Sequence, residues 1–349
     1  MRLEPREHSS LLLKAMVPFG SAIAALLVCS ILIVWAGASP VQALLLLIKG
    51  SVGSKFAISE TLARTIPLIF TGLAAAIAFK AKLWNIGAEG QLYGGACIAT
   101  WLGTGMIDLP GYLMLPLLFA AGSIVGGLLL LGPTLLKTWL AVDEVVTTLL
   151  LNFIILLFVN YLVFGPWKDP MAMGWPQAAS VVDNAVLPTL LAKTRLHMGL
   201  IWGLGAAVVL WLFMRFTIWG YEIRAVGYNA VASRFAGIPV NPVVMRTALI
   251  SGGLAGCAGV SELCGLKGYL TLDLSPGFGY SGIVVAMLAA LHPVGVIFSA
   301  FFVAMLSIGA DSMSRSLNIS NFIADVATAV ALLAVLVSML LVRYRIRWR

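Results

Sequence analysis

Residues 112–136 decide the fold, and they read YLMLPLLFAAGSIVGGLLLLGPTLL. The run carries no charged side chain, and a helix needs about 20 such residues to cross the hydrocarbon core of a bilayer. Inside lipid every backbone amide needs a partner within the protein, so a spanning segment is either a helix or a strand of a closed barrel. Barrel strands would alternate in polarity over about 10 residues. The unbroken apolar run therefore predicts a transmembrane helix.

The composition of the whole chain agrees with this local prediction. Of 349 residues, 61% are hydrophobic and only 10% are charged, and the mean hydropathy is +1.02. Soluble domains usually carry about 25% charged residues, so this chain cannot cover itself with a water-facing surface. The composition excludes a soluble protein and predicts an all-α membrane protein.

Similar runs recur along the chain and predict about ten transmembrane helices. No linker or soluble segment separates them, so residues 1–349 are expected to form a single transmembrane domain. The segment 280–291 is too short to cross unaided, which predicts a half-helix or re-entrant segment packed inside protein. The predicted spans are 16–38, 58–79, 86–107, 112–136, 145–164, 198–218, 244–264, 280–291, 294–311 and 322–342.

The Lys and Arg residues between the runs predict the orientation, because cytoplasmic loops of membrane proteins are enriched in them. If the N-terminus lies inside, the inner side receives the larger share of these cations, so both termini are predicted to be cytoplasmic. Two hydrophilic segments then face opposite sides: an outer loop at about 165–197 and an inner loop at about 219–242.

Several classes of function find no support in the sequence. The net charge of +8 is spread between the apolar runs and forms no single patch, so no nucleic-acid partner is expected. The four cysteines have no Cys-x-x-Cys spacing and the three histidines are scattered, so neither a metal nor another cofactor is expected. No Ser/His/Asp set indicates an enzyme.

The inner loop contains a short helix with predicted ends. Asn229 is a good N-cap, residues 230–236 favour helix, Gly237 suits the position after the last turn, and Pro239 prevents resumption. Its surface is mostly Ala, with Arg234 and Phe235, so another protein could approach closely and bind Phe235 in a pocket.

Two interpretations of this helix stay open: a connecting helix that lies on the membrane, and a docking element for a cytoplasmic partner. The sequence contains no Gly-x-x-x-x-Gly-Lys-Ser/Thr motif, and the nearest run, residues 50–55, fails the spacing. If a nucleotide powers this protein, the ATPase is a separate subunit that must dock. That requirement favours the second interpretation.

Polar side chains within spans are expensive in lipid and are candidates for function. If the third span is helical from Asn85, then Asn85 and Glu89 share one face, which could hydrogen-bond a solute or lock two helices together. Asn152 is the better candidate to face a pathway in span five, where Asp143 is expected to be a helix cap. Glu262 is a further intramembrane carboxylate.

Five blocks of sequence, in order, carry a resemblance to a known family: residues 85–91 (NIGAEGQ), 143–152 (DEVVTTLLLN), 220–239 (GYEIRAVGYNAVASRFAGIP), 251–256 (SGGLAG) and 277–286 (GFGYSGIVVA). They resemble permeases of bacterial ATP-binding-cassette (ABC) importers for nucleosides and simple sugars, above all the nucleoside type. The likeness covers roughly residues 60–345. It departs at 289–293 (AALHP), where relatives often carry a Gly-Arg pair and an Asn before the proline.

The resemblance implies a ten-span permease of the type II ABC importer kind in the inner (plasma) membrane of a bacterium. Its implied partners are a cassette ATPase, a second homologous permease and an extracytoplasmic lipoprotein receptor, besides the lipid bilayer. The candidate pathway residues, chosen as polar side chains within or beside the spans, are Asn85, Glu89, Gln91, Asn152 and Glu262. The implied ATPase-coupling residues are Glu222, Arg224, Gly227, Asn229, Arg234, Phe235 and Gly237.

Two other functions were weighed. An ion-coupled secondary transporter would also show Gly-interrupted spans and intramembrane carboxylates, although a capped cytoplasmic helix has no required role there. A polytopic membrane enzyme would need a catalytic set that the sequence does not display. The sequence therefore favours an ABC importer permease for a nucleoside or simple sugar.

Overall fold

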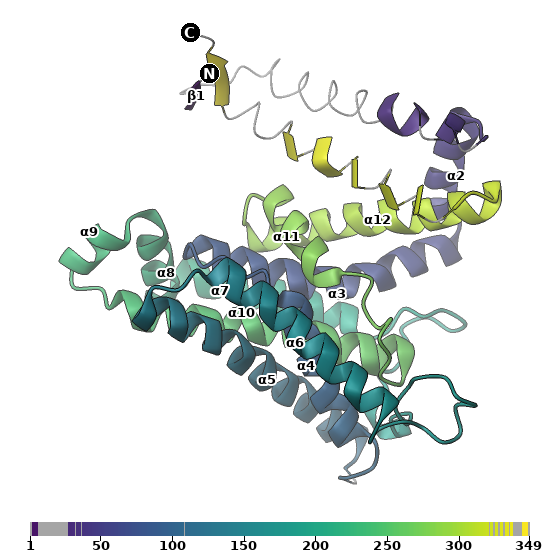
Figure 1. The fold of residues 1–349 in the computed structure, drawn as a ribbon, viewed down its shortest axis with the longest axis horizontal. Coiled ribbons are helices and arrows are strands. Elements are labelled where there is room, and N and C mark those ends of the chain that lie inside the picture. Colours follow the sequence, from purple (N-terminus) through teal and green to yellow (C-terminus); the bar gives the residue numbers. More distant parts are fainter. Residues whose placement is uncertain are drawn as a thin grey trace. The chain divides into compact units, whose positions relative to one another are not determined.

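The computed structural model describes residues 2–5, 27–31, 33–35, 37–107 and 109–320, with short pieces at 322–323, 325–326, 329–330, 332–334, 336–337 and 344–347. The predicted spans 16–38 and 322–342 lie only partly within these residues. The chain divides into two compact units: Met1–Thr61 with Phe301–Arg349, and Leu62–Ala300 (Figure 1). Helices α3 (Lys55–Lys80) and α12 (Pro293–Leu317) contain the boundaries between them.

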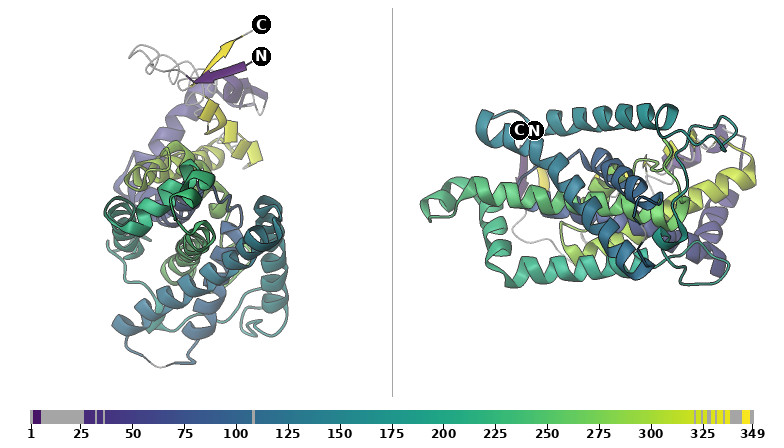
Figure 2. Two further views of the ribbon diagram at one scale, coloured as in Figure 1. Left: turned by 90° about the vertical axis from the view of Figure 1, so that its left-hand side faces the viewer. Right: turned by 90° about the horizontal axis from the view of Figure 1, so that it is seen from below.

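The second unit holds most of the predicted helices, and their observed bounds lie close to the predicted ones. Its remaining elements are α4 (Ala88–Gly103), α5 (Gly111–Leu140), α6 (Glu144–Phe164), η1 (Asp183–Ala185), α7 (Gly199–Phe216), α8 (Ile218–Tyr228), α9 (Ala230–Phe235), α10 (Val240–Glu262), the π-helical turn η2 (Leu263–Lys267) and α11 (Phe278–Leu288). Figures 1 and 2 show α8 and α9 at one end of this unit and the 165–198 segment at the other.

The first unit contains a helix that the sequence did not predict, α2 (Pro40–Val52). It follows a helical stretch at Leu27–Trp35, bent from it by 107°. Ala43 of α2 is fully buried beside Ile33, Ala310 and Met313. Two four-residue strands, β1 (Arg2–Pro5) and β2 (Tyr344–Arg347), pair antiparallel. The other elements that the structure describes in this unit are helices, as predicted.

The lengths of the helices support a membrane protein. Within the described residues, α3, α5, α6, α7, α10 with η2, and α12 are each long and apolar enough to cross a bilayer, and the bent pair in the first unit would add one more. Helix α11 has only 11 residues, or about 16 Å of rise, which agrees with the prediction that the eighth segment cannot cross unaided. The count of ten spans and the cytoplasmic position of both termini stay predictions.

The core of the second unit is the packing of α10 along α5 and α4. Glycines allow it: a Cβ on Gly126 would collide with the Gly252 carbonyl oxygen, and a Cβ on Gly256 with that of Gly122. The pairs Gly122/Gly126 and Gly252/Gly256 have the four-residue spacing of small side chains that is typical of close helix contacts in membranes. The backbone of α4 also meets α10, where a Cβ on Gly95 would collide with the Gly256 carbonyl oxygen. Helix α10 therefore packs closely on both α5 and α4.

Candidate functional site

The connection between α3 and α4 is not helical, and it contributes to a buried polar cluster. Leu83 to Ile86 have no helical structure, and α4 begins only at Ala88. The condition that Asn85 and Glu89 lie on one helical face is therefore wrong, because Asn85 precedes the helix. Both side chains are nevertheless buried.

Asn85 makes every hydrogen bond that its amide group can make in this position. Its Oδ1 accepts from Gly87 N–H at 2.9 Å and from Gln91 Nε2 at 2.9 Å. Its Nδ2 donates to Gln91 Oε1 at 2.9 Å and to Ser251 Oγ of α10 at 3.1 Å. Ser251 in turn donates to the Ala74 carbonyl of α3 at 2.7 Å. The amide thus ties α3, α4 and α10 together.

Asn152 has the same role on the side of α6. Its Oδ1 accepts from Gly90 N–H of α4 at 2.8 Å, and its Nδ2 donates to the Ile86 carbonyl at 2.9 Å and to Tyr280 Oη of α11 at 3.1 Å. A Cβ on Gly90 would lie 2.9 Å from Asn152 Oδ1, so Gly90 permits the close approach. Asn152 therefore links three segments and is fully buried.

Glu89 joins α4 to the start of the short helix α11. Its Oε2 accepts from Gly279 N–H at 2.6 Å, in the first turn of α11. The first N–H groups of a helix have no partner within the helix, so a carboxylate there satisfies a donor and complements the helix dipole. Nearby, Tyr93 Oη donates to the Leu272 carbonyl at 2.6 Å and accepts from Ser275 N–H at 3.2 Å.

A second carboxylate, Glu144, contacts the connection between α3 and α4 at the end of the unit where α8 lies. Lys137 forms a salt bridge with Glu144 and also donates to the Lys82 carbonyl at 3.1 Å. Trp84 N–H donates to Glu144 Oε1 at 3.3 Å. The neighbouring Asp143 accepts from Val145 N–H at 2.7 Å, which confirms its prediction as a helix cap.

Four of the five sequence blocks therefore meet in one hydrogen-bonded network. Asn85 and Gln91 come from the first block, Asn152 from the second, Ser251 from the fourth and Tyr280 from the last. Thr148 also takes part, because its hydroxyl oxygen accepts from Ile86 N–H at 3.3 Å. The sequence did not predict Thr148, Ser251 or Tyr280 as site residues. Their presence inside the ordered blocks was the available signal, but only the fold brings them together.

Glu262 lies apart from this network. It is buried near the end of α10, within electrostatic range of Arg64 and Lys267. Arg64 also stands over the Phe278 ring, with its guanidinium carbon 5.1 Å from the ring centroid. The predicted pathway residues thus form two groups, one around Asn85 and one at Glu262. In the part of the chain that the structure describes, no three His, Cys, Asp or Glu side chains gather as metal ligands would.

The short helix of the inner loop is built as the sequence predicted. Asn229 caps α9 by accepting from Val231 N–H and Ala232 N–H, each at 3.0 Å. Gly237 follows the helix with φ at +82°, a left-handed conformation in which glycine is favoured. The Phe235 side chain is 90% exposed and Arg234 is exposed too. A cavity of about 500 Å³ beside the base of α9 includes Lys82, Tyr228 and Val244.

The preceding helix, α8, connects this exposed element to the bundle. Glu222 pairs with Arg246 of α10 at 3.3 Å, and Arg246 lies over the Trp219 ring at 5.0 Å. A Cβ on Gly227 would collide with the Lys80 carbonyl at the end of α3. The predicted coupling residues therefore divide: Glu222 and Gly227 fix α8 to α10 and α3, while Arg234 and Phe235 are presented outward.

At the opposite end, the 165–198 segment is fastened through His197. Its Nδ1 accepts from Gly199 N–H at 3.2 Å, and the ring lies against Gly265, where a Cβ would collide with it. Burial lowers the pKa of His197 to about 4, so the imidazole is neutral at pH 7. The Leu187 N–H also donates to the Cys264 carbonyl at 2.8 Å.

Long apolar helices, a buried polar network and an exposed capped helix at one end define a multi-pass membrane protein of the transport-permease class. The chain belongs to the family described as "branched-chain amino acid transport system / permease component", whose model matches residues 57–343.

Curated relatives cover most of the chain. A guanosine ABC transporter permease, NupP, from Bacillus subtilis is 34% identical and aligns over 92% of each chain. A glucose ABC transporter permease, TsgB13, from Haloferax volcanii is 31% identical over 99% of this chain and 93% of its own. A nucleoside ABC transporter permease, NupB, from Lactococcus lactis is 31% identical over 86% of this chain and 85% of its own.

Proposed function

We propose that this chain is the membrane permease subunit of an ABC importer that moves a nucleoside or a simple sugar into the cytoplasm. The names of the three relatives support this solute class. The observation that carries the proposal is the exposed α9 with Phe235, in a chain whose sequence has no phosphate-binding motif of its own. ATP is then hydrolysed on a separate subunit that docks at α9.

The contacts of α8 suggest how movement enters the bundle. A displacement of α9 acts on α8, and α8 is joined to α10 through Glu222 and Arg246 and packs on α3 at Gly227. Both helices then contribute to the network around Asn85, through Ser251 and Ala74. The route from the docking helix to the buried polar groups is therefore short and made of packed elements.

The pathway roles of Asn85, Glu89, Gln91, Asn152 and Glu262 belong to the same proposal. In the described conformation the amide of Asn85 makes four hydrogen bonds to three residues, and the amide of Asn152 makes three hydrogen bonds to three residues. A solute would have to replace these bonds. We infer that the network holds one wall of the pathway in one state and exchanges partners when the pathway opens, since a transporter needs different affinities in its two states.

The remaining features complete the proposed assembly. The chain forms one membrane domain of about ten spans with both termini in the cytoplasm, in the plasma membrane of a bacterium. It pairs with a second, similar permease and with the ATPase, and an extracytoplasmic lipoprotein delivers the solute. The family and the transporter names of the relatives support a multi-subunit system.

The test is uptake by proteoliposomes that contain this chain with its cognate permease, ATPase and receptor. Radiolabelled guanosine and glucose are offered with and without ATP on the cytoplasmic side. We expect uptake of one solute class only with ATP, and loss of ATPase co-purification in Phe235→Glu, which adds a charge where an apolar anchor should bind.

The matched control is Met173→Glu, which adds the same charge at a fully exposed apolar position in the 165–198 segment. The Met173→Glu variant should still co-purify with the ATPase. Uptake that runs on a proton or sodium gradient without ATP would instead establish a secondary transporter. Normal ATPase binding and uptake in Phe235→Glu would remove the docking role of α9.

A further inference from the structure

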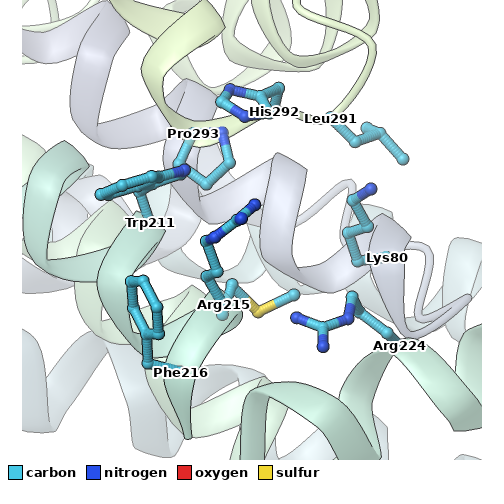
Figure 3. A pocket seen from close by; sticks show the side chains of 9 residues that line it. Lys80, Trp211, Arg215, Phe216, Arg224, Leu291, His292 and Pro293 are labelled. Atoms are coloured by element: carbon cyan, nitrogen blue, oxygen red, sulfur yellow. The ribbon is translucent and has the colours of Figure 1, made fainter.

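A basic cavity of about 570 Å³ lies at the same end of the second unit as α8 (Figure 3). It is bounded by α7, α8, the end of α3 and the turn between α11 and α12. Three cationic side chains line the cavity: Lys80 of α3, Arg215 of α7 and Arg224 of α8. The apolar part of the lining includes Trp211, Phe216 and Pro293.

Among the residues that the structure describes, none of Lys80, Arg215 and Arg224 forms a salt bridge, and the nearby Glu222 is taken by Arg246. Figure 3 shows the three charged groups around one space. Like charges that line one cavity repel one another, and an anion bound between them relieves the repulsion. Guanidinium groups suit phosphate because they donate in a fixed fork.

The walls of the cavity indicate what carries that anion. Trp211 and Phe216 are the kind of side chain that lies at the membrane–water interface. Helix α7 continues from the cavity with an exposed apolar face formed by Leu212, Val209, Val208 and Ile201. A ligand with a phosphate in the cavity and acyl chains along α7 would use both surfaces. A free nucleotide would leave that apolar face unused.

We propose that this cavity binds the phosphate headgroup of an anionic phospholipid of the cytoplasmic leaflet, phosphatidylglycerol or a lipid of the same charge class. The cytoplasmic side follows from the Lys and Arg distribution, and basic pockets between helices on that side are suited to such headgroups. The inference goes beyond the proposed function, since it depends on neither the solute nor the ATPase. The bound lipid would join α3, α7 and α8, next to the helix that carries the coupling movement.

The first experiment measures lipid retention. The purified permease complex is mixed with phosphatidylglycerol or phosphatidylcholine and analysed by native mass spectrometry. We expect retained phosphatidylglycerol in wild type and a loss of roughly a hundredfold in apparent affinity in the K80Q/R215Q/R224Q variant, because each cation near an anionic lipid contributes about fivefold. The K49Q/K168Q/K193Q variant removes the same charge at positions predicted to lie outside, and should retain the lipid.

The second experiment needs no charge variant, so it holds even if the triple variant fails to fold. Wild type and Trp211→Phe are placed in nanodiscs with brominated phosphatidylglycerol, which quenches nearby tryptophans. We expect a quenched component that Trp211→Phe lacks, and that brominated phosphatidylcholine does not produce.

Three outcomes would overturn the proposal. Equal quenching of Trp211 by both lipids would mean contact with bulk lipid without a headgroup site. Displacement of the signal by millimolar inorganic phosphate, with no preference for the anionic lipid, would mean a site for a soluble phosphate. Retention of phosphatidylglycerol by K80Q/R215Q/R224Q would place the lipid elsewhere.

Discussion

At the residue scale, the buried amides are the most constrained polar groups of the molecule. The segment before α4 is not helical, so its backbone groups lack helical hydrogen-bond partners. The Asn85 side chain accepts from Gly87 N–H, and the Asn152 side chain donates to the Ile86 carbonyl. A buried N–H or C=O without a partner costs about 1–3 kcal/mol, and inside a membrane water cannot substitute easily. These side chains are thus part of the framework in the described conformation, whatever they contact when the pathway opens.

The substitution Asn152→Ala tests this framework role. It leaves Gly90 N–H and the Ile86 carbonyl without their partner, so we expect a loss of about 2–5 kcal/mol, seen as a lower unfolding temperature of the detergent-solubilised protein. Asn160→Ala is the matched control, because Asn160 is exposed on the same helix. If Asn152→Ala keeps its unfolding temperature but loses uptake, the side chain serves the solute and not the framework.

The lowered pKa of His197 predicts a pH dependence of stability. The unfolded histidine titrates near 6.5 and the folded one at about 4, so the unfolded state binds more protons between these values. Stability is therefore full above about pH 6.5 and falls as the pH drops towards 4, by about 3 kcal/mol in total. The measurement is the unfolding temperature between pH 7.5 and 4.5.

His197→Asn provides the comparison, because the Asn oxygen can accept from Gly199 N–H and does not titrate. Other groups titrate alike in both proteins, so the difference between the two curves isolates the imidazole. Two parallel curves would show that the ring is protonated in the folded protein without cost.

At the scale of elements, the crossing of α5 and α10 determines how closely α4 is held. The glycines on both helices let the backbones meet, as their spacing predicts. The start of α4 could not be predicted in the same way, because residues 85–91 are as compatible with helix as with an extended segment until Thr148 and Asn152 supply hydrogen bonds. Helix α2 was missed because it is short and its apolar run is broken by Lys49.

The substitution Gly126→Ala tests the crossing. Its new methyl group would collide with the Gly252 carbonyl, so we expect the helices to separate and stability to fall by about 1–3 kcal/mol, with a lower unfolding temperature. Gly205→Ala is the comparison, because Gly205 lies in the interior of α7 with open space around it, and this change should raise stability by up to about 1 kcal/mol. Equal behaviour of the two variants would contradict backbone contact at Gly126.

At the scale of the whole molecule, the sequence predicted the class of protein and the order of its helices better than the contacts between distant segments. Apolar length predicted the bounds of the long helices of the second unit to within about four residues, and cap chemistry predicted α9 because Asn229 and Gly237 act locally. The convergence of Asn85, Asn152 and Ser251 depends on three separate segments, so no local pattern reveals it. The basic cavity was hidden for the same reason.

The backbone contacts at Gly126, Gly252 and Gly256 also limit how the gene can change. Every glycine codon begins with GG, and any single-base change at either of these bases encodes a residue with a Cβ or a stop. Even the mildest replacement, alanine, adds the methyl group for which the crossing has no room. Drift at these codons is therefore confined to the third base, and compensation would require the partner helix to move as a whole.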